Sequence, residues 1–378
     1  MKALIIGAGR MAEAVLHDFV QFQTFDAVTL ADADLARAEG LARRRGGAVT
    51  RAVRLDAADE AAARTLIAGH DVCVSAAPFK YNLSLARAAL AAGAHFTDMG
   101  GNNDVVAAEL ALDGEARAAG VTVVPDMGLA PGLATVLAAG LLARLDETRE
   151  LHLRVGGLPC EPKPPLNYAL VFSPYGLINE YAEPCVVLRN GALERVPPLT
   201  GVEELTWPPF GALEAFHTSG GASTLPHTLR GRVRELDYKT LRYAGHAAQV
   251  KLLFDLGLAS QEAVRVGNAR VAPRDVLCER LVATLPEGTD DVVLVRCWAA
   301  GVKDGREVRV AFELEEYADA ASGLTAMMRL TGFPVAVAAA TLARREATRA
   351  GALPVEEAFA PAPFLAAMRE RGVVIKES

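Results

Sequence analysis

The sequence lacks several features that would assign it to a particular class of protein. Its five cysteines are scattered, odd in number and never spaced as Cys-x-x-Cys. This pattern argues against a disulfide framework and a zinc site, and it fits a reducing compartment. No tract rich in lysine and arginine is present, and the net charge is −7. We therefore expect no metal site, and no nucleic-acid partner either, because binding to phosphates needs a basic face.

A long uninterrupted apolar run is also absent. The most apolar stretch, residues 127–145, contains Pro131 and several glycines, and it is too short and too broken to span a bilayer. Met1 and Lys2 lead directly into an apolar run that the fold needs as a strand rather than as the core of a signal peptide. We expect a cytoplasmic protein without a membrane partner.

The composition and the apolar pattern of the first third are those of a globular α/β protein. Of the 378 residues, 51% are hydrophobic and 22% are charged, which is typical of a soluble chain of about two domains. Short apolar runs alternate with alanine-rich amphipathic stretches, which predicts right-handed βαβ units and a doubly wound parallel sheet. The predicted strands are residues 3–6, 27–30, 48–53, 71–74, 94–97 and 121–124, and the predicted helices are residues 11–21, 34–45, 57–68, 82–92 and 104–119.

The pattern changes after residue 125. Glycine, proline and aromatic residues become frequent over residues 156–226, and Asn190-Gly191 between two apolar runs is a strong hairpin signal. Residues 292–298 and 308–314 form a second apolar pair around a turn at 303–305, and residues 233–243 alternate as a strand. We predict a second, α+β domain with a mixed, largely antiparallel sheet and with helices at 247–256 and 274–284. After this domain, a helical, alanine-rich pattern returns over residues 322–349.

The first strand is followed by a glycine-rich motif, Gly-Ala-Gly-Arg-Met-Ala at residues 7–12, which opens a predicted helix. Gly7 permits the tight turn, Gly9 lets the backbone approach a pyrophosphate, and Ala12 is small enough for close helix–strand packing. The helix N-terminus presents N–H groups and a positive dipole end to phosphates. The motif predicts dinucleotide binding rather than a plain strand–helix turn.

An acidic residue, Asp32, ends the second strand 25 residues after Gly7. A carboxylate there accepts hydrogen bonds from the adenosine ribose and repels a 2′-phosphate, so we predict NAD over NADP, although the nearby Arg37 could accommodate that phosphate. Asp34 is the expected helix N-cap. Asp56, after the third strand, either contacts the adenine or caps a helix. Small residues after the fourth strand let the cofactor pass over the sheet. The predicted cofactor residues are Gly7, Gly9, Arg10, Met11, Ala12, Asp32, Asp56, Ala76, Ala77 and Pro78.

At this point the chain resembles the saccharopine dehydrogenase superfamily, and within it most closely the lysine 6-dehydrogenase branch. The resemblance covers nearly the whole length, with Ala244 standing where the family usually has proline. The stretches that carry it are residues 7–12, 75–78, 98–101, 126–132, 214–226 and 238–246.

The resemblance implies a domain organisation and a reaction. A Rossmann domain at residues 1–126 would be followed by a substrate and dimerisation domain at 127–321, a helix at about 322–350 that returns to the first domain, and a tail at 351–378. The family's members are commonly dimers, so we expect a homo-oligomer. The reaction implied is the NAD-dependent oxidation of L-lysine at its ε-carbon, which releases ammonia and gives allysine, a semialdehyde that can cyclise.

That reaction requires a neutral amine, a base and a clamp for the α-carboxylate. Arg242 shares one face of an alternating strand with Thr240, and it is the candidate clamp, with a surface ion pair as the alternative. Lys239 points to the opposite face and is expected to be solvated. The predicted catalytic residues are His246, Asp126 and Asp98, and the predicted substrate residues are Arg242, Thr240, Thr218, Ser219, Tyr168 and Glu214, with capping or turn roles as alternatives.

Two other functions stay open. The first is that of a saccharopine dehydrogenase or a related reductase that joins an amine to a semialdehyde, which needs extra cations for a second carboxylate. The second is that of a non-catalytic NAD-binding regulator, which would bind the cofactor tightly without turnover of any amine.

Overall fold

The computed structural model describes residues 1–378, and the chain divides into two compact units. Unit 1 comprises residues 1–140 and 328–373, and unit 2 comprises residues 141–327 and 374–378. The last residues of the chain therefore contribute to both units. Where we expected a C-terminal tail, the structure has β17 (Gly351–Ala352), α13 (Val355–Ala358), α14 (Pro361–Glu370) and β18 (Ile375–Glu377).

Unit 1 is built on a seven-stranded, fully parallel sheet with the order β17-β6-β5-β4-β1-β2-β3. The six predicted strands are all present, and β17 adds a seventh beside β6. This order places the switch point between β1 and β4, where ligands bind in sheets of this kind. The strands are β1 (Lys2–Ile6), β2 (Ala27–Asp32), β3 (Thr50–Arg54), β4 (Val72–Ser75), β5 (His95–Asp98) and β6 (Thr122–Val124).

The helices between these strands agree closely with the predicted ones. One predicted helix is split into α5 and α6, and Asp113 at the start of α6 accepts a hydrogen bond from the Ala352 N–H, which holds β17 in place. Asp34 caps α2 as predicted, through the Arg37 N–H. These helices are α1 (Arg10–Gln21), α2 (Leu35–Arg45), α3 (Glu60–Ile67), α4 (Asn82–Ala92), α5 (Asn103–Leu110) and α6 (Asp113–Ala119). A further helix, α7 (Leu133–Leu142), follows β6 and was not predicted.

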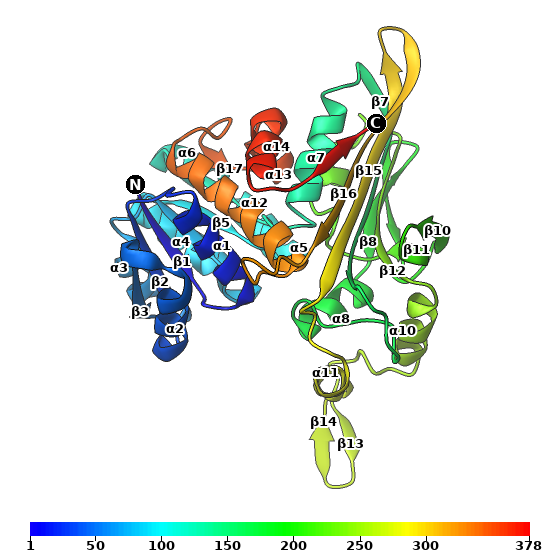
Figure 1. The fold of residues 1–378 in the computed structure, drawn as a ribbon, viewed down its shortest axis with the longest axis horizontal. Helices are drawn as coiled ribbons and strands as arrows, with labels where there is room; N and C mark the ends of the chain where they lie inside the picture. Colours follow the sequence, from blue (N-terminus) through cyan, green and yellow to red (C-terminus); the bar gives the residue numbers. More distant parts are fainter. The chain divides into compact units, whose positions relative to one another are not determined.

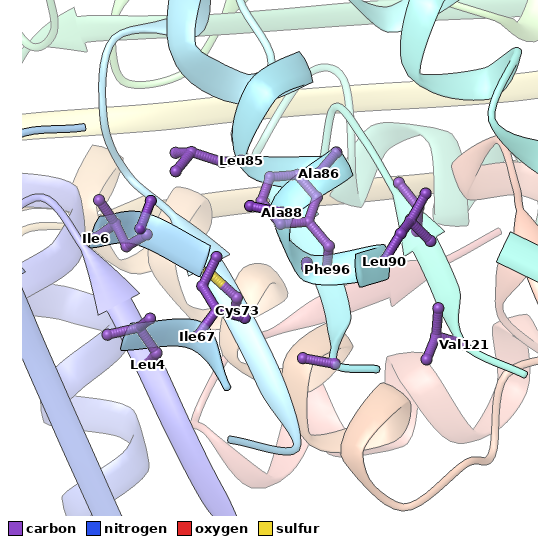
Figure 2. Packing of buried hydrophobic residues seen from close by; sticks show 14 of the residues in the cluster. Leu4, Ile6, Ile67, Cys73, Leu85, Ala86, Ala88, Leu90, Phe96 and Val121 are labelled. Carbon is purple, nitrogen blue, oxygen red and sulfur yellow. The ribbon is translucent and has the colours of Figure 1, made fainter. Parts of the chain in front are cut away.

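The core of unit 1 forms where α3, α4 and α6 cover one face of the sheet (Figure 2). Leu4 and Ile6 of β1 contribute to this cluster, together with Phe96 of β5. Ala3 and Ile5 point to the other face, because side chains alternate along a strand, and they are equally buried. Burial on both faces explains why the strands of this sheet are continuous apolar runs in the sequence.

The predicted helix at 322–349 is α12 (Ala326–Ala343), and most of it belongs to unit 1. It packs on α1 so closely that a Cβ at Gly332 would lie 2.5 Å from the Ala14 Cβ. By length and composition α12 could cross a membrane, but 78% of it is buried inside the protein. Its apolar character is therefore that of a core helix.

Unit 2 contains a mixed, largely antiparallel sheet, as predicted (Figure 1). Its main path runs β10-β11-β12-β7-β15-β16-β18, in which only β12 and β7 are parallel, and β8 and β9 join at the side of β12. The strands are β7 (Glu147–Pro159), β8 (Cys185–Arg189), β9 (Ala192–Val196), β10 (Glu203–Trp207), β11 (Gly211–His217), β12 (Glu235–Tyr243), β15 (Asp291–Lys303) and β16 (Arg306–Tyr317).

Both predicted hairpins of unit 2 are present. β8 and β9 are joined by Asn190 and Gly191, and β15 and β16 by Asp304 and Gly305, and all four turn residues have positive φ. Positive φ at both central residues is the requirement of the tight hairpin turn that Asn-Gly and Asp-Gly favour. A third, short hairpin of β13 (Val264–Val266) and β14 (Ala269–Val271) follows α10.

The helices of unit 2 gather at one end of its long strands (Figure 1). α10 (His246–Asp255) and α11 (Pro273–Thr284) agree with the predicted helices, and α9 (Leu225–Thr228) is a short turn. α8 (Pro174–Ala182) lies within the proline-rich stretch and was not predicted. The Ser173 hydroxyl accepts a hydrogen bond from the Gly176 N–H, and Pro174 opens the helix, an arrangement that favours helix initiation.

Candidate functional site

The glycine-rich corner of unit 1 has the geometry of a phosphate-binding loop. Gly7 has φ +103°, and a Cβ there would lie 2.6 Å from the Ala76 carbonyl oxygen, so only glycine fits. Gly9 is exposed, and a Cβ there would meet nothing within 4 Å. No side chain caps the N-terminus of α1 at Gly9. The corner therefore leaves open space in front of a helix N-terminus, which fits the pyrophosphate of a dinucleotide.

The Asp32 side chain, at the end of β2, forms a hydrogen bond with the backbone of the glycine-rich corner. One carboxylate oxygen accepts a hydrogen bond from the Ala8 N–H at 2.7 Å, and the other accepts one from the Asp34 N–H at 2.8 Å. The side chain is partly exposed. The predicted carboxylate thus stands beside the predicted phosphate loop, where it fits the sugar of an adenosine group.

The remaining predicted cofactor residues lie on the same edge of the sheet. Arg10, Met11 and Ala12 form the first turn of α1. The Ala76 N–H donates a hydrogen bond to the Ile6 carbonyl at the end of β1. Asp56 does not cap α3; Asp59 does, and Asp56 accepts a hydrogen bond from the Ala58 N–H in the preceding turn. Ala77 and Pro78 continue the loop after β4.

A pair of buried carboxyl groups lies below the ends of β5 and β6. Asp98 accepts hydrogen bonds from the Gly100 and Asp126 N–H groups. Burial raises the pKa of Asp98 to about 6, and burial together with the charge of Asp98 raises the pKa of Glu109 to about 10. A proton shared between the two carboxyl groups would satisfy oxygens that otherwise have no partner. Asp98 therefore holds the backbone around Asp126, and its role as a base stays a prediction.

Unit 2 contains a second group of predicted residues, centred on Arg242. Its guanidinium is buried and has no acidic hydrogen-bond partner: Nε–H donates to the Tyr181 hydroxyl at 3.0 Å, and Nη1 donates to the Leu241 carbonyl at 2.9 Å. The Tyr168 ring faces the guanidinium at 4.9 Å from the ring centroid. We call Arg242, Tyr168, Tyr181 and His246 the Arg242 cluster.

His246 is held inside this cluster. Its Nδ1–H faces the Leu166 carbonyl at 3.0 Å, and its Nε2 lies 3.1 Å from the Tyr181 hydroxyl. Burial and the charge of Arg242 lower the pKa of His246 to about 3, so the ring is neutral. Because the carbonyl can only accept, Nε2 accepts from Tyr181. With both ring nitrogens in use, this geometry argues against the prediction that His246 is the base.

Other predicted substrate residues surround the cluster. The Tyr168 hydroxyl is buried without a hydrogen-bond partner. The Thr218 and Thr240 hydroxyls bond to each other at 2.7 Å. The Ser219 hydroxyl donates to the Asn179 carbonyl at 3.3 Å, and its N–H donates to the Glu180 carbonyl at 2.8 Å. These contacts join the end of β11 to α8.

Glu214 has the capping role that was the alternative to a substrate contact. Its carboxylate accepts hydrogen bonds from the Gly245 N–H at 2.9 Å and from the Ala247 N–H. These groups begin α10, whose N-terminus has no other side-chain cap. Glu214 therefore caps the helix and complements its dipole, and a contact of its carboxylate with substrate stays a prediction.

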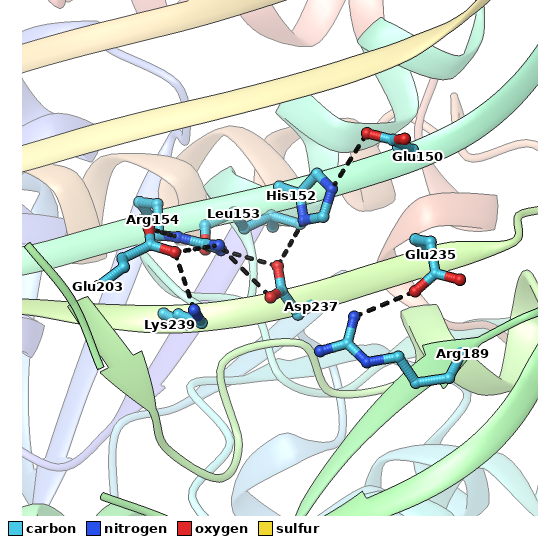
Figure 3. A network of polar contacts seen from close by, with 9 residues as sticks. All are labelled: Glu150, His152, Leu153, Arg154, Arg189, Glu203, Glu235, Asp237 and Lys239. Carbon is cyan, nitrogen blue, oxygen red and sulfur yellow. Dashed lines mark hydrogen bonds and ion pairs between the residues drawn. The ribbon is translucent and has the colours of Figure 1, made fainter. Parts of the chain in front are cut away.

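The opposite face of β12 carries a network of paired charges (Figure 3). Arg154 of β7 pairs with Asp237 at 2.8 Å and with Glu203, and Lys239 pairs with Glu203 at 2.8 Å. His152 also contacts Asp237, at 2.6 Å. The prediction that Lys239 is solvated was wrong, because β10 supplies Glu203 to cover it. Every charge in this network is neutralised by a neighbour.

The geometry of unit 1 defines a Rossmann-fold dinucleotide-binding protein. The chain belongs to the saccharopine dehydrogenase family: it matches the saccharopine dehydrogenase NADP binding domain over residues 3–124 and the saccharopine dehydrogenase C-terminal domain over residues 128–373.

Similar proteins have been characterised in yeast and in cattle. Saccharopine dehydrogenase [NADP(+), L-glutamate-forming] of Saccharomyces cerevisiae is 24% identical over 75% of this chain and 64% of its own length. The mitochondrial alpha-aminoadipic semialdehyde synthase of Bos taurus is 25% identical over 74% of this chain and 31% of its own length. The chain thus spans less than two thirds of these relatives. The apo structure of the yeast enzyme covers 100% of this chain with a TM-score of 0.81 at 21% identity, which shows a shared fold.

Three residues of these sites were not predicted from the sequence. Tyr181 and Glu180 lie on α8, which was hidden in the proline-rich stretch, and Glu109 lies within a helix whose exposed and buried faces were not distinguished. The signal for α8 was present as Ser173-Pro174 followed by Leu177, Ile178 and Tyr181, which are spaced for one helical face.

Proposed function

We propose that this protein oxidises the carbon–nitrogen bond at the ε-carbon of an amino acid that contains the lysine skeleton, with L-lysine as the substrate and NAD as the cofactor. The observation that carries this proposal is Arg242, a buried guanidinium with no acidic hydrogen-bond partner, next to the unpartnered Tyr168 hydroxyl. A buried arginine of this kind fits one carboxylate. The proposal assigns the dinucleotide to unit 1 and the amino acid to unit 2.

The overall reaction balances as lysine, oxidised dinucleotide and water giving allysine, ammonium, reduced dinucleotide and a proton. The bound dinucleotide supplies the hydride acceptor. Arg242 holds the carboxylate, and the Tyr181–His246 hydrogen bonds fix the guanidinium in place. The amine must lose a proton before its carbon can be oxidised, and its usual pKa is about 10.4. Asp126 stays the predicted base.

Saccharopine is the second candidate substrate, and the comparisons favour it over lysine. The relatives in yeast and cattle carry names from saccharopine metabolism, and the yeast name specifies NADP(+). The Arg242 cluster favours lysine, because it contains one cation, whereas saccharopine carries further carboxylates that would need their own partners.

Initial-rate assays with each substrate and each dinucleotide test the proposal. We expect reduction of NAD with L-lysine and release of ammonia, with saccharopine oxidised more slowly. Faster turnover of saccharopine than of lysine would replace the first substrate by the second. Reduction of neither dinucleotide with either substrate would refute both candidates, and would leave the regulator function if calorimetry still detected dinucleotide binding.

Dinucleotide preference is tested by the double variant Asp32→Ser/Ala33→Arg. Ala33 is exposed beside Asp32. Removing the carboxylate and adding a cation should shift the ratio of the dissociation constants of NAD and NADP toward NADP by at least about tenfold. The variant Glu39→Gln, at an exposed position on the following helix α2, is the matched control. An unchanged ratio would mean that Asp32 does not contact the ribose.

A further inference from the structure

α8 places an acidic side chain, Glu180, next to the Arg242 cluster. Glu180 immediately precedes Tyr181, whose hydroxyl accepts the hydrogen bond of Arg242 Nε–H. The backbone of Glu180 is fixed as well, because its carbonyl accepts the Ser219 N–H at 2.8 Å. Figure 1 shows α8 at the end of the sheet where β12 ends and α10 begins. The acid and the guanidinium therefore belong to the same part of unit 2.

Glu180 and Arg242 do not form an ion pair with each other. The Glu180 carboxylate makes no hydrogen bond or ion pair in the protein, although the charge of Arg242 acts on it. By contrast, the buried Arg154 of the same sheet contacts an acid, Asp237, directly at 2.8 Å. Opposite charges held near each other without contact leave room for a ligand that carries both charges.

The raised pKa of Glu180 agrees with a buried carboxyl group that has no cation in direct contact with it. Burial raises the pKa of Glu180 to about 7, and the charge of Arg242 lowers it only in part. The residue as a whole is partly accessible to solvent. An ammonium group at the carboxylate would restore the charged form of the acid.

The ligand that matches this arrangement is an α-amino acid. Its carboxylate and its ammonium group are attached to one carbon, so they lie side by side and carry opposite charges. Arg242 offers N–H groups that are not used inside the protein, and Tyr168 adds a hydroxyl without a partner. A primary amine without a carboxylate, or a carboxylate without an α-amine, would leave one of the two charged side chains unpaired, which is unfavourable in a buried site.

We propose that Glu180 and Arg242 together bind the α-amino acid head group of the substrate, Glu180 taking the α-ammonium and Arg242 the α-carboxylate. This inference deepens the proposed function and rests on it for the substrate class. It makes Glu180 a specificity-determining residue, and it leaves the ε-amine as the end that reacts. It also means that the base of the reaction is a residue other than Glu180.

Calorimetric binding tests the head-group site without turnover. The ligands are L-lysine, L-norleucine, which has the head group but no ε-amine, and 6-aminohexanoate, which lacks the α-amine. We expect the wild type to bind L-norleucine and L-lysine at least about tenfold more tightly than 6-aminohexanoate. Glu180→Gln should bring the three dissociation constants within about threefold of one another by weakening the two α-amino acids. Glu279→Gln, exposed on α11, is the matched control and should change nothing.

The outcomes separate this inference from the proposed function. Equal binding of L-norleucine and 6-aminohexanoate to the wild type, or an unchanged preference in Glu180→Gln, would overturn the head-group site even if L-lysine is oxidised. A fall in kcat of Glu180→Gln with L-lysine and with 6-aminohexanoate alike, at unchanged KM, would also overturn it and make Glu180 the base. Binding of L-norleucine that Glu180→Gln abolishes would support the site even if no lysine is oxidised.

Discussion

The two faces of the unit 2 sheet carry buried arginines in opposite situations, Arg154 on β7 and Arg242 on the neighbouring strand β12. On one face, Arg154 of β7 is neutralised by Asp237 and Glu203 (Figure 3). On the other, Arg242 contacts hydroxyl, carbonyl and aromatic groups, and no acid bonds to it. A paired buried charge is explained by the fold alone. A buried charge without an acid partner is expensive for the folded state, and a ligand that completes it gives a reason for its presence.

Replacing Arg154 should have the largest effect on stability. Arg154→Met would leave the buried Asp237 without its main cation, at a cost of about 3 kcal/mol in the free energy of unfolding. Urea denaturation at pH 7 measures this change. Arg296→Met, which breaks a more exposed ion pair with Glu313 on the same sheet, is the control and should cost less than about 1 kcal/mol.

The pH dependence sharpens the interpretation of Arg154. Burial alone would raise the pKa of Asp237, but the hydrogen bond from His152 and the charge of Arg154 hold that pKa below its usual value. An acid with a lowered pKa in the folded state stabilises the protein above its unfolded pKa of about 3.9, and this contribution is lost as the pH falls further. Acid unfolding should therefore be less steep in Arg154→Met. An equally steep acid transition would mean that Asp237 is not part of the network.

Replacing Arg242 should separate binding from stability. Arg242→Met should weaken L-lysine binding by about 100-fold, since it removes the only cation of the cluster. The free energy of unfolding should stay the same or increase, because a charge with no acid partner is removed from the interior. Calorimetry and urea denaturation of the same variant measure both quantities. A loss of stability like that of Arg154→Met would erase the distinction between the two faces.

Unit 1 offers a third kind of buried charge, the like-charged pair of Asp98 and Glu109. The pKa of Glu109 is raised to about 10 by burial and by the charge of Asp98. The contribution of Glu109 to the free energy of unfolding is therefore lost as the pH rises above its unfolded pKa of about 4.3. Glu109→Gln should therefore stabilise the protein by about 1 kcal/mol at pH 8, and by much less at pH 4.

Urea denaturation at the two pH values checks the Glu109 prediction. Glu115→Gln, on the exposed side of α6, is the control and should leave the difference between pH 4 and pH 8 unchanged. A Glu109→Gln variant that is less stable at pH 8 would show that the carboxylate, rather than the shared proton, supports the loop around Asp126.

The fold of unit 1 could be predicted because each of its elements is encoded locally. Strands covered on both faces are continuous apolar runs, and Gly7 and Gly9 sit where the turn requires them. In unit 2 the hairpin at Asn190-Gly191 could be predicted for the same reason. The strand β7 was not predicted, although it lies at the centre of the sheet. Its first residues are exposed or half-buried and its last seven are all buried, so the strand as a whole shows no single pattern of apolar residues.

The sequence by itself determined the parallel sheet, the phosphate-binding corner with Asp32, the two tight hairpins and the face of β12 on which Arg242 lies. Only the tertiary structure decided which charges are paired. Lys239 is covered by Glu203 from a distant strand, Glu214 is used by the start of α10, and His246 is occupied by Tyr181 and Leu166. Pairing depends on residues far apart in the chain, and a strand's alternation gives the direction of a side chain but not what meets it there.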